Sequence, residues 1–342
     1  MRGLGRFIAI VALTLMGTQA LAADSAVVFM YHRFDDPRFP TANTRLDQLQ
    51  DHIAELKAGN YTVWPIPRII AALKSGQPLP ERTVGLSIDD AWITVYRTAW
   101  PHLKAANLPF TLFVVTDETD SGGAEYMSWD QIREMTQSGL VTIGSQGAGH
   151  PHMPALSAAA VAEDLTRAAA RFQAELGSVP KLFAWPFGEM SREAETTVRA
   201  AGYDAAFGQH SGPAWLHSDP YFLPRFALNE TYGEIERFRL AARTLALPVI
   251  DVTPADPKLV NNPPLFGFTL AQDVPGVELL ACYAAHEGKL AIEQLGPRVE
   301  VRMMKPFPPG RGRINCTIPT LDGRWRWFGW QFYLSPDGSN AN

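Results

Sequence analysis

Two adjacent carboxylates, Asp89 and Asp90, follow the largely apolar run 83–88. A short run of this kind, bounded by Pro80, predicts a buried strand. In α/β proteins, reacting groups are placed at the carboxyl ends of the strands. Neighbouring residues on an extended chain point opposite ways, so one acid could accept a proton while the other holds a metal ion. A solvated strand end is the simpler alternative, and these residues alone favour it.

A glycine-rich turn further along the chain reverses that preference. Residues 145–152 carry Gln146, His150 and His152. Histidine is the commonest metal ligand, and carboxylates suit harder cations. A lone histidine is usually structural. The order found here, a strand ending in two acids and then a turn rich in histidine, predicts a metal site that includes Asp90 and His150.

Alternating strand-like and helix-like segments must position these groups, and such alternation predicts parallel βα units. Strands are expected at 27–31, 61–64, 84–88, 109–115, 140–144, from 181, and at 204–207. Helices are expected at 46–56, 67–74, 93–106, from 128 with a Ser-x-x-Gln capping box, at 158–176 and at 192–201. About seven such units before residue 210 predict a deformed (β/α) barrel rather than an open sheet.

A smaller all-β, sandwich-like domain is expected to follow. Prolines cluster from residue 247, helical periodicity stops, and strand candidates appear at 265–270, 277–283, 290–295, 299–303, 313–318 and 325–334. The alternating aromatic residues of the last strand are predicted to form core rather than a glycan platform. Cys282 and Cys316 are expected to form a disulfide that joins two strands. Two buried free thiols are the alternative.

The first 22 residues have the features of a secretory signal peptide: a basic end, an apolar stretch, and small residues before a cut after Ala22. A buried N-terminal helix is the weaker alternative. We therefore divide the chain into a signal peptide at 1–22, a barrel domain at 23–246 and a β domain at 247–342, and expect a periplasmic or secreted protein. Cleavage would remove Arg2 and Arg6 and change the formal charge from −5 to about −7. This acidity argues against a nucleic-acid partner, and no later apolar run is long enough to span a membrane.

The motifs resemble those of the NodB-homology polysaccharide deacetylases, carbohydrate esterase family 4, over roughly residues 27–226. Their Thr-Phe-Asp-Asp motif appears as Ser87-Ile-Asp89-Asp90, which implies that Asp89 is the general base and Asp90 a metal ligand. Their His-x-x-x-His-Pro motif appears as Gln146-Gly-Ala-Gly-His150-Pro, so Gln stands where the first metal-binding histidine would be. The resemblance implies a NodB-like barrel.

The third motif resembles the branch of this family that contains poly-N-acetylglucosamine deacetylases. Residues 184–188 read Ala-Trp-Pro-Phe-Gly, and Trp185 and Phe187 are expected to contact substrate, as is His152. In that branch a histidine after the first strand supplies the catalytic acid, a role that fits His32. Arg225 is also expected at the substrate-binding site, where it could replace, beside Asp89, the arginine that this motif lacks.

The resemblance implies a hydrolase that removes acetyl groups from N-acetylated sugars of an extracytoplasmic polysaccharide. It also implies a divalent metal ion of the Zn, Co, Ni or Mn type, held by Asp90, His150 and Gln146. A Gln carbonyl is a poorer ligand than imidazole, and His152 is an alternative third ligand. Two other functions remain open: a catalytically degenerate, glycan-binding envelope protein, and a purely structural envelope protein.

Overall fold

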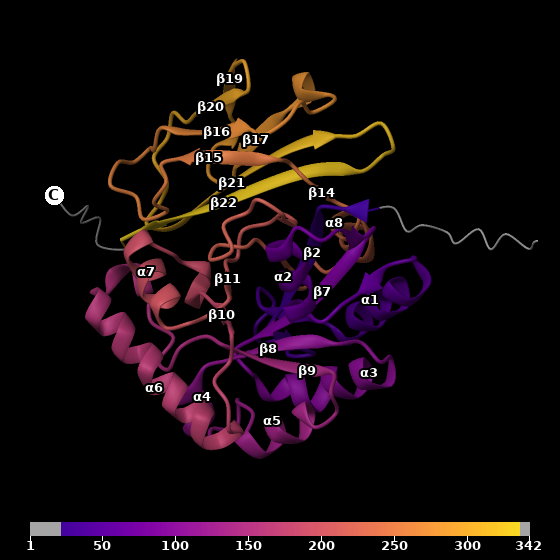
Figure 1. Cartoon of the computed structure of the whole chain (residues 1–342). Coiled ribbons are helices and arrows are strands. Elements are labelled where there is room, and N and C mark those ends of the chain that lie inside the picture. The colour runs from indigo at the N-terminus through magenta and orange to yellow at the C-terminus, as the bar shows by residue number, and fades with distance from the viewer. Residues whose placement is uncertain (1–21, 336–342) are drawn as a thin grey trace, which may run out of the picture.

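A curved nine-stranded sheet organises the larger part of the molecule (Figure 1). The computed structural model describes residues 22–335, so the expected signal peptide lies almost wholly outside the described residues. The parallel strands lie in the order β11 (Ala205–Phe207), β10 (Leu182–Ala184), β9 (Val141–Ser145), β8 (Phe110–Val114), β7 (Thr83–Asp89) and β2 (Ser25–Tyr31). Strands β2 and β7 are buried at every residue, as expected for parallel strands covered on both faces. The predicted fold class, a deformed barrel followed by a strand-rich region, is confirmed.

Short strands complete this sheet at its edges. β12 (Ala214–Trp215) pairs antiparallel with β2, β13 (Phe226–Ala227) pairs parallel with β2, and β5 (Thr62–Val63) pairs parallel with β7. The sequence predicted β5 but neither β12 nor β13. A two-residue strand has no periodicity of its own, so only its pairing with β2 defines it.

Helices flank the sheet: α1 (Leu46–Ala58), α2 (Ile66–Ser75), α3 (Trp100–Ala105), α4 (Thr116–Asp120), α5 (Trp129–Thr136), α6 (Ala158–Leu176), α7 (Arg192–Ala200) and α8 (Ile235–Ala242). Ser128 and Gln131 form the expected capping box of α5. The helix predicted at 93–106 begins instead as a π-helical turn at 95–99. Helix α8 was not predicted. None of the helices within 22–335 is both long and apolar enough to cross a membrane.

Two sheets, antiparallel except where β14 pairs with β22, form the C-terminal region, above the barrel in Figure 1. The first contains β14 (Leu245–Ala246), β22 (Trp325–Leu334), β21 (Gly310–Pro319), β17 (Ala281–Ala284) and β18 (Gly288–Lys289). The second contains β15 (Val249–Thr253), β16 (Phe266–Leu270), β20 (Arg298–Arg302) and β19 (Ala291–Leu295). The strand predicted at 277–283 begins as a 3-10 turn at 277–279, and the proline-rich stretch after residue 247 contains β15.

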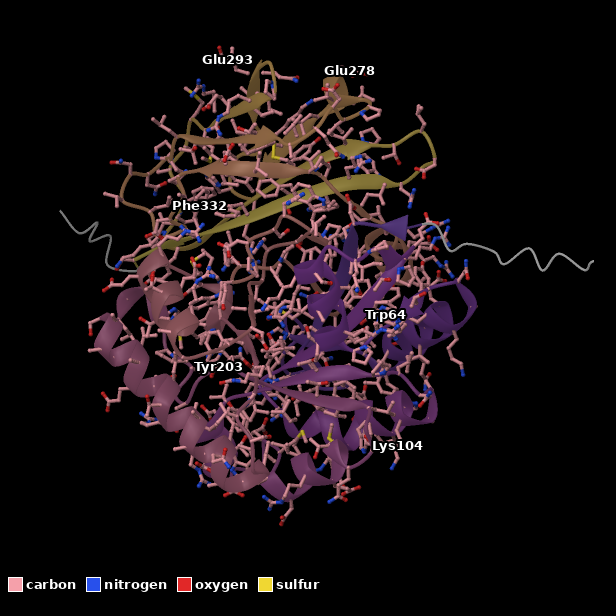
Figure 2. All side chains as sticks on the ribbon, in the orientation of Figure 1. Trp64, Lys104, Tyr203, Glu278, Glu293 and Phe332 are labelled. Atoms are coloured by element: carbon pink, nitrogen blue, oxygen red, sulfur yellow. A yellow bond between two sulfur atoms is a disulfide. The ribbon has the colours of Figure 1, made fainter. Side chains whose placement is uncertain are left out.

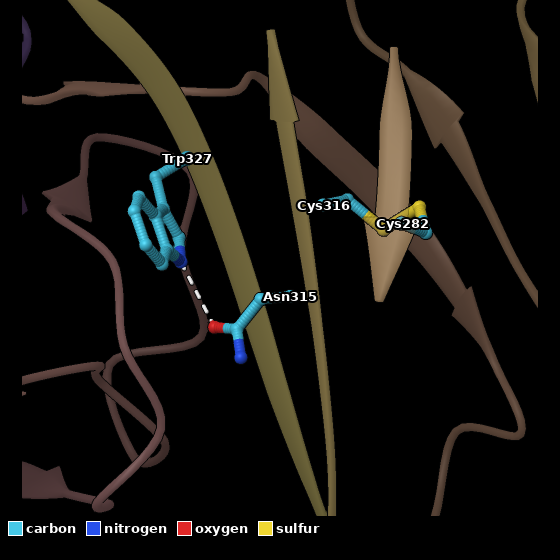
Figure 3. Close-up of a disulfide and its surroundings, with 4 residues drawn as sticks. All are labelled: Cys282, Asn315, Cys316 and Trp327. Carbon is cyan, nitrogen blue, oxygen red and sulfur yellow. Dashed lines mark hydrogen bonds between the residues drawn. A yellow bond between two sulfur atoms is a disulfide. The ribbon is translucent and has the colours of Figure 1, made fainter. Parts of the chain in front are cut away.

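A disulfide joins Cys282 of β17 to Cys316 of β21, as predicted (Figure 3). The two cysteines are directly opposite in the strand register, and both are fully buried. Trp327 and Asn315 project from the other face of the sheet, where the indole N–H donates to Asn315 Oδ1 at 2.9 Å. The aromatic residues of β22 therefore divide. Trp330 and Phe332 lie in the core and Trp327 packs against it, as predicted, whereas Trp325 is exposed, contrary to the sequence prediction.

The barrel and the C-terminal sheets share one hydrophobic core. Phe183 and Trp185 of the barrel belong to the same buried cluster as Phe266 and Phe332 of the sheets. Side chains fill the space between the two parts, with Phe332 at their junction (Figure 2). The C-terminal strands therefore pack against the end of the barrel at which β10 ends.

Candidate active site

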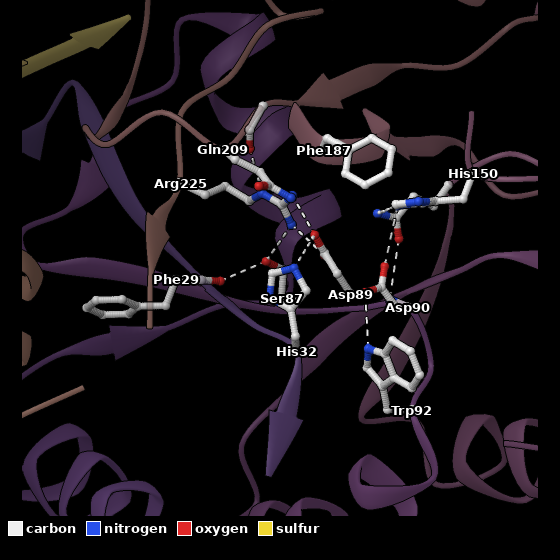
Figure 4. A network of polar contacts seen from close by, with 12 residues as sticks. Phe29, His32, Ser87, Asp89, Asp90, Trp92, His150, Phe187, Gln209 and Arg225 are labelled. Carbon is white, nitrogen blue, oxygen red and sulfur yellow. Dashed lines mark hydrogen bonds and ion pairs between the residues drawn. The ribbon is translucent and has the colours of Figure 1, made fainter. Parts of the chain in front are cut away.

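Asp89, the last residue of β7, is completely buried and is held by one arginine (Figure 4). Arg225 Nη1 donates to Asp89 Oδ1 at 2.7 Å, and Nη2 donates to Oδ2 at 2.8 Å. The same guanidinium donates to Ser87 Oγ and to the Gly208 carbonyl oxygen, each at 3.0 Å. A carboxylate offers about four lone-pair sites. The arginine therefore fixes Asp89 and leaves one acceptor site on each oxygen.

Strand pairing brings Arg225 to this position. It directly precedes β13, whose Phe226 is the register partner of Phe29 in β2, the strand beside β7. Its backbone N–H also donates to the carbonyl oxygen of His210. Arg225 lies beside Asp89, as expected from the need for a positive charge next to this carboxylate. Its Nε, Nη1 and Nη2 atoms all donate to protein oxygens, so we expect Arg225 to orient Asp89 rather than to contact a substrate.

His32, just beyond β2, faces the same carboxylate. Its Nε2 atom lies 4.0 Å from Asp89 Oδ2, and 18% of its side chain is exposed, against none for Asp89. The preceding residue, Tyr31, anchors this strand end through its hydroxyl group, which contacts His52 Nδ1 at 3.1 Å. His32 is thus the more accessible member of an imidazole–carboxylate pair.

Asp90 turns away from Asp89 because the backbone changes direction there. Asp90 and Ala91 have φ values of 71° and 52°, in the left-handed region that non-glycine residues seldom adopt. The Trp92 indole N–H donates to Asp90 Oδ2 at 3.1 Å. Asp90 Oδ1 is buried without a hydrogen-bond partner and lies 3.7 Å from His150 Nε2. This oxygen is a free acceptor aimed toward the histidine.

Gln146 fills the space beside Asp90 and His150. Its Oε1 accepts a hydrogen bond from the Asp90 backbone N–H at 3.3 Å, and its Nε2 lies 3.1 Å from His150 Nε2. Gln146 is fully buried. Burial is the main cause that lowers the pKa of His150, and the charges of Asp90 and Asp89 oppose it. A neutral His150 would accept the Gln146 amide N–H through its Nε2 lone pair.

A buried carboxylate on α6 holds this turn in shape. Asp164 accepts hydrogen bonds from the backbone N–H groups of Ala148 and Gly149 at 2.9 and 2.8 Å. Gly147 has φ 82°, and a Cβ atom there would lie 2.3 Å from Asp164 Oδ2. The glycine is therefore required, and Asp164 fixes the direction in which His150 leaves the turn.

The turn after β10 forms the opposite wall. The Phe187 ring stacks on His152 at 4.2 Å and meets His150 edge-on at 4.4 Å. Gln331 of β22 donates from Nε2 to the carbonyl oxygens of Phe187 and Gly188 at 3.1 and 2.9 Å. The C-terminal region thus fixes one wall of the site.

Comparison with known proteins identifies the family of this segment. Residues 76–206 match the family model described as polysaccharide deacetylase. The chain carries a polysaccharide deacetylase domain. The segment that matches includes Asp89, Asp90, Gln146, His150 and Phe187. The family resemblance seen in the sequence is thereby confirmed, and so is the enzyme class, whereas the roles of single residues are not tested by it.

Relatives of the deacetylase domain carry a common name. A poly-β-1,6-N-acetyl-D-glucosamine N-deacetylase of Staphylococcus aureus is 22% identical over 217 residues, covering 59% of this chain and 73% of that protein. The protein of the same name from Escherichia coli K12 is 25% identical over 245 residues, covering 59% of this chain but only 36% of that protein.

Solved structures share the fold of the deacetylase domain. IcaB from Ammonifex degensii superposes with a TM-score of 0.58 at 24% identity, over 66% of this chain and all of that one (100%). The Streptococcus pyogenes deacetylase PplD superposes with a TM-score of 0.59 at 19% identity, over 64% of this chain and 98% of that one.

The residues of the deacetylase domain fit a divalent cation in part. Asp90 Oδ1 and His150 Nε2 converge, and the orphaned carboxylate oxygen lacks any other partner. Gln146 does not complete the set, because its amide nitrogen, and not its carbonyl oxygen, faces His150 Nε2. Within residues 22–335, no three His, Cys, Asp or Glu side chains form a metal-binding group. A bound cation would therefore have two strong ligands and would require Gln146 to turn.

His152 lies apart from these ligands. Its Nδ1 contacts Glu189 Oε2 at 2.6 Å, and half of the side chain is exposed. Burial raises the pKa of Glu189, and the contact with His152 opposes that shift. This placement suits a substrate contact at the rim better than a third metal ligand.

Trp185 is wrong as a substrate contact. It is fully buried, and its indole N–H donates to the Tyr221 carbonyl oxygen at 2.8 Å. Sequence reasoning also missed Asp164 and Gln331. Asp164 stood out only as an acid on the otherwise apolar, buried stripe of α6. Nothing in the sequence around Gln331 signals its contact with a turn 144 positions earlier.

Proposed function

We propose that this chain is a hydrolase that removes acetyl groups from N-acetylated sugars of a polysaccharide outside the cytoplasm. The observation that carries the proposal is the pairing of a buried, arginine-held Asp89 with an accessible His32 at the carboxyl ends of neighbouring strands. The extracytoplasmic location rests on the N-terminal sequence and on the disulfide, which is typical of oxidising compartments. We also propose the division into residues 23–246 and 247–342, since the reacting groups all come from the first segment.

The proposed chemistry is hydrolysis of an acetamide. Asp89 accepts a proton from water as the water oxygen bonds to the acetyl carbon, using a lone pair that Arg225 leaves free. His32, in its protonated form, then donates a proton to the sugar nitrogen as the carbon–nitrogen bond breaks. The products are acetate and a free amino sugar. Acid and base assistance of this kind are each worth about 10²–10⁴-fold in rate.

A divalent cation, when bound between Asp90 and His150, would polarise the acetyl oxygen. Gln146 must first turn its amide, which would leave the buried Asp90 N–H without an acceptor. An unsatisfied buried group costs about 1–3 kcal/mol, equivalent to a roughly 5- to 150-fold loss in affinity. We therefore propose weak metal binding, with a Zn, Co, Ni or Mn type ion, and activity that needs added metal.

Glycan binding without cleavage is the second candidate, because the Gln146 amide nitrogen lies against His150 Nε2, the atom that would bind the metal ion. Acetate release from chitohexaose and from a β-1,6-linked N-acetylglucosamine oligomer, with each metal added in turn, distinguishes the two. The enzyme should release acetate, and Asp89→Asn should not. Asp120→Asn is the matched control, because Asp120 forms a similar two-pronged pair with Arg171 and is not among the site residues. Binding without acetate release would favour the second candidate.

A further inference from the structure

A groove of about 810 Å³ lies beside the active site, between α8 and the five-stranded sheet. Side chains from both sides line it, among them Tyr232, Arg237, Tyr283, Arg313, Trp325 and Trp327. The metal ligands and the proton-transfer pair do not line it. The groove is therefore a second surface, formed jointly by the barrel and the C-terminal region.

Aromatic rings on its walls are open to solvent. Tyr232, Tyr283 and Trp325 are 53%, 44% and 36% exposed, and exposed apolar side chains that gather in one groove mark a candidate binding surface. Trp325 and Trp327 alternate on β22, so both project from the face opposite the disulfide. Exposed rings on one flat strand face are suited to stack against the apolar faces of sugar rings.

The charges in the groove are all positive. Arg237 and Arg313 are half-buried, and among the described residues neither guanidinium has a carboxylate within 4.0 Å. Arg237 instead lies over the Trp327 ring, with its guanidinium carbon 5.0 Å from the ring centroid, and Arg313 Nε donates to the neutral Gln331. Lys289 adds a third cation, and no Asp or Glu lines the groove.

This lack of counter-charge contrasts with a neighbouring arginine. Arg239, two residues after Arg237 on the same helix, pairs with both Glu55 and Glu236. Holding arginine partly out of water without an acid is costly, and burial lowers the pKa of both Arg237 and Arg313. An anionic ligand that entered the groove would relieve this cost.

The groove meets the active site at residues 208–210. Gln209 lines the groove. The residues on either side of it, Gly208 and His210, accept hydrogen bonds from Arg225 through their carbonyl oxygens. Arg313 is linked through Gln331 to the wall of the site at Phe187. The two surfaces therefore lie close together.

We propose that this groove binds a sugar chain carrying carboxylates, so that the substrate is an acidic N-acetylated polysaccharide. The choice of a sugar chain rests on the proposed function, and the choice of an acidic one rests on the unpaired arginines. Deacetylation turns each acetamide into an ammonium group, which a cationic groove would repel. A polymer whose carboxylates alternate with its amino sugars would stay bound both before and after deacetylation.

Titration calorimetry with two hexasaccharides tests the proposal. Hyaluronan hexasaccharide alternates glucuronate with N-acetylglucosamine, and chitohexaose is its neutral counterpart. Asp89→Asn protein is used for both, so that binding is measured without turnover. We expect the hyaluronan fragment to bind about tenfold or more tightly than chitohexaose, as charge-assisted hydrogen bonds predict, and added salt to weaken that preference.

Variants locate the binding surface. Arg237→Gln and Arg313→Gln should each weaken hyaluronan binding by about tenfold and leave chitohexaose unchanged, whereas Arg239→Gln should change neither. Arg237→Gln keeps the test decisive even where Arg313→Gln disturbs the Phe187 turn. Equal affinity for the two sugars, no binding of the acidic one, or variants that bind it normally would each overturn the proposal. If the wild type binds the acidic sugar but releases no acetate, the proposal for the groove is retained and only the proposed deacetylation is refuted.

Discussion

Replacement of Arg225 by methionine tests the central contact of the site. The change removes a guanidinium that is completely buried and that donates to both oxygens of an equally buried Asp89. Breaking a buried ion pair by deleting one partner costs about 3–5 kcal/mol, because the other charge is left uncompensated. We therefore expect Arg225→Met to lower the free energy of unfolding by about that amount and to abolish acetate release.

The double variant Asp89→Leu/Arg225→Met separates charge from packing. Replacing both members of a buried pair with apolar residues is often nearly neutral. Here the Gly208 carbonyl and Ser87 Oγ still lose a donor, so some destabilisation remains. The double variant should nevertheless be more stable than Arg225→Met alone.

Urea unfolding followed by tryptophan fluorescence measures these differences. Arg239→Met is the control, since that arginine also forms ion pairs, with Glu55 and Glu236, but lies at the surface, where ion pairs contribute little. A loss of less than about 1 kcal/mol in Arg225→Met would contradict the reasoning, because it falls well below the cost of an uncompensated buried charge. The reasoning would also be contradicted if the double variant lost as much free energy of unfolding as Asp89→Leu and Arg225→Met lose together.

Three further predictions concern the metal ligands, the response to acid and the disulfide. Gln146→His should bind Zn²⁺ or Co²⁺ more tightly than the wild type in calorimetry; equal affinity would show that Gln146 is no obstacle. Burial lowers the pKa of His52 to about 4 and that of His210 to about 3. Below about pH 6.5 these histidines take up protons in the unfolded state but not in the folded state. The free energy of unfolding should therefore fall as the pH is lowered from about 6.5 to about 4, by about 1.4 kcal/mol per pH unit for each histidine. Urea unfolding across this range should show a shallower slope in His52→Gln; an unchanged slope would exclude His52. Cys282→Ser/Cys316→Ser should lose about 3–4 kcal/mol for a loop closed over 34 residues, and two alkylatable thiols in the unreduced wild type would contradict the bond.

Elements with strong local signals were predictable from the sequence. Helix α6 has the predicted bounds, because Ser157 caps its start and Gly177 takes the left-handed conformation at its end. Strand β7 followed from its apolar run between Pro80 and the two acids. The strands β12 and β13 were not predictable, because two residues that pair only with a distant strand carry no local pattern.

The site was predictable in its members but not in its contacts. The order of motifs brought Asp89, Asp90 and His150 to one edge of the sheet, where the structure has them. The Gln146 amide is oriented by its hydrogen bond with the Asp90 backbone N–H. That N–H faces Gln146 because the backbone is left-handed at Asp90. Trp185 failed as a prediction because the end of β10 directs its ring into the core shared with the C-terminal sheets, a packing that motif order does not reveal.

Acetate release from an N-acetylated hexasaccharide, with mass spectrometry of the sugar product, tests the proposed activity most directly. With added divalent metal, we expect the purified protein to release acetate and to yield the matching free amino sugar, and we expect Asp89→Asn to do neither while binding the same sugar. Acetate release at the wild-type rate by Asp89→Asn would show that the reaction does not use this carboxylate. No release by the wild type, with any metal and with either acidic or neutral N-acetylated sugars, would contradict the proposed deacetylation itself.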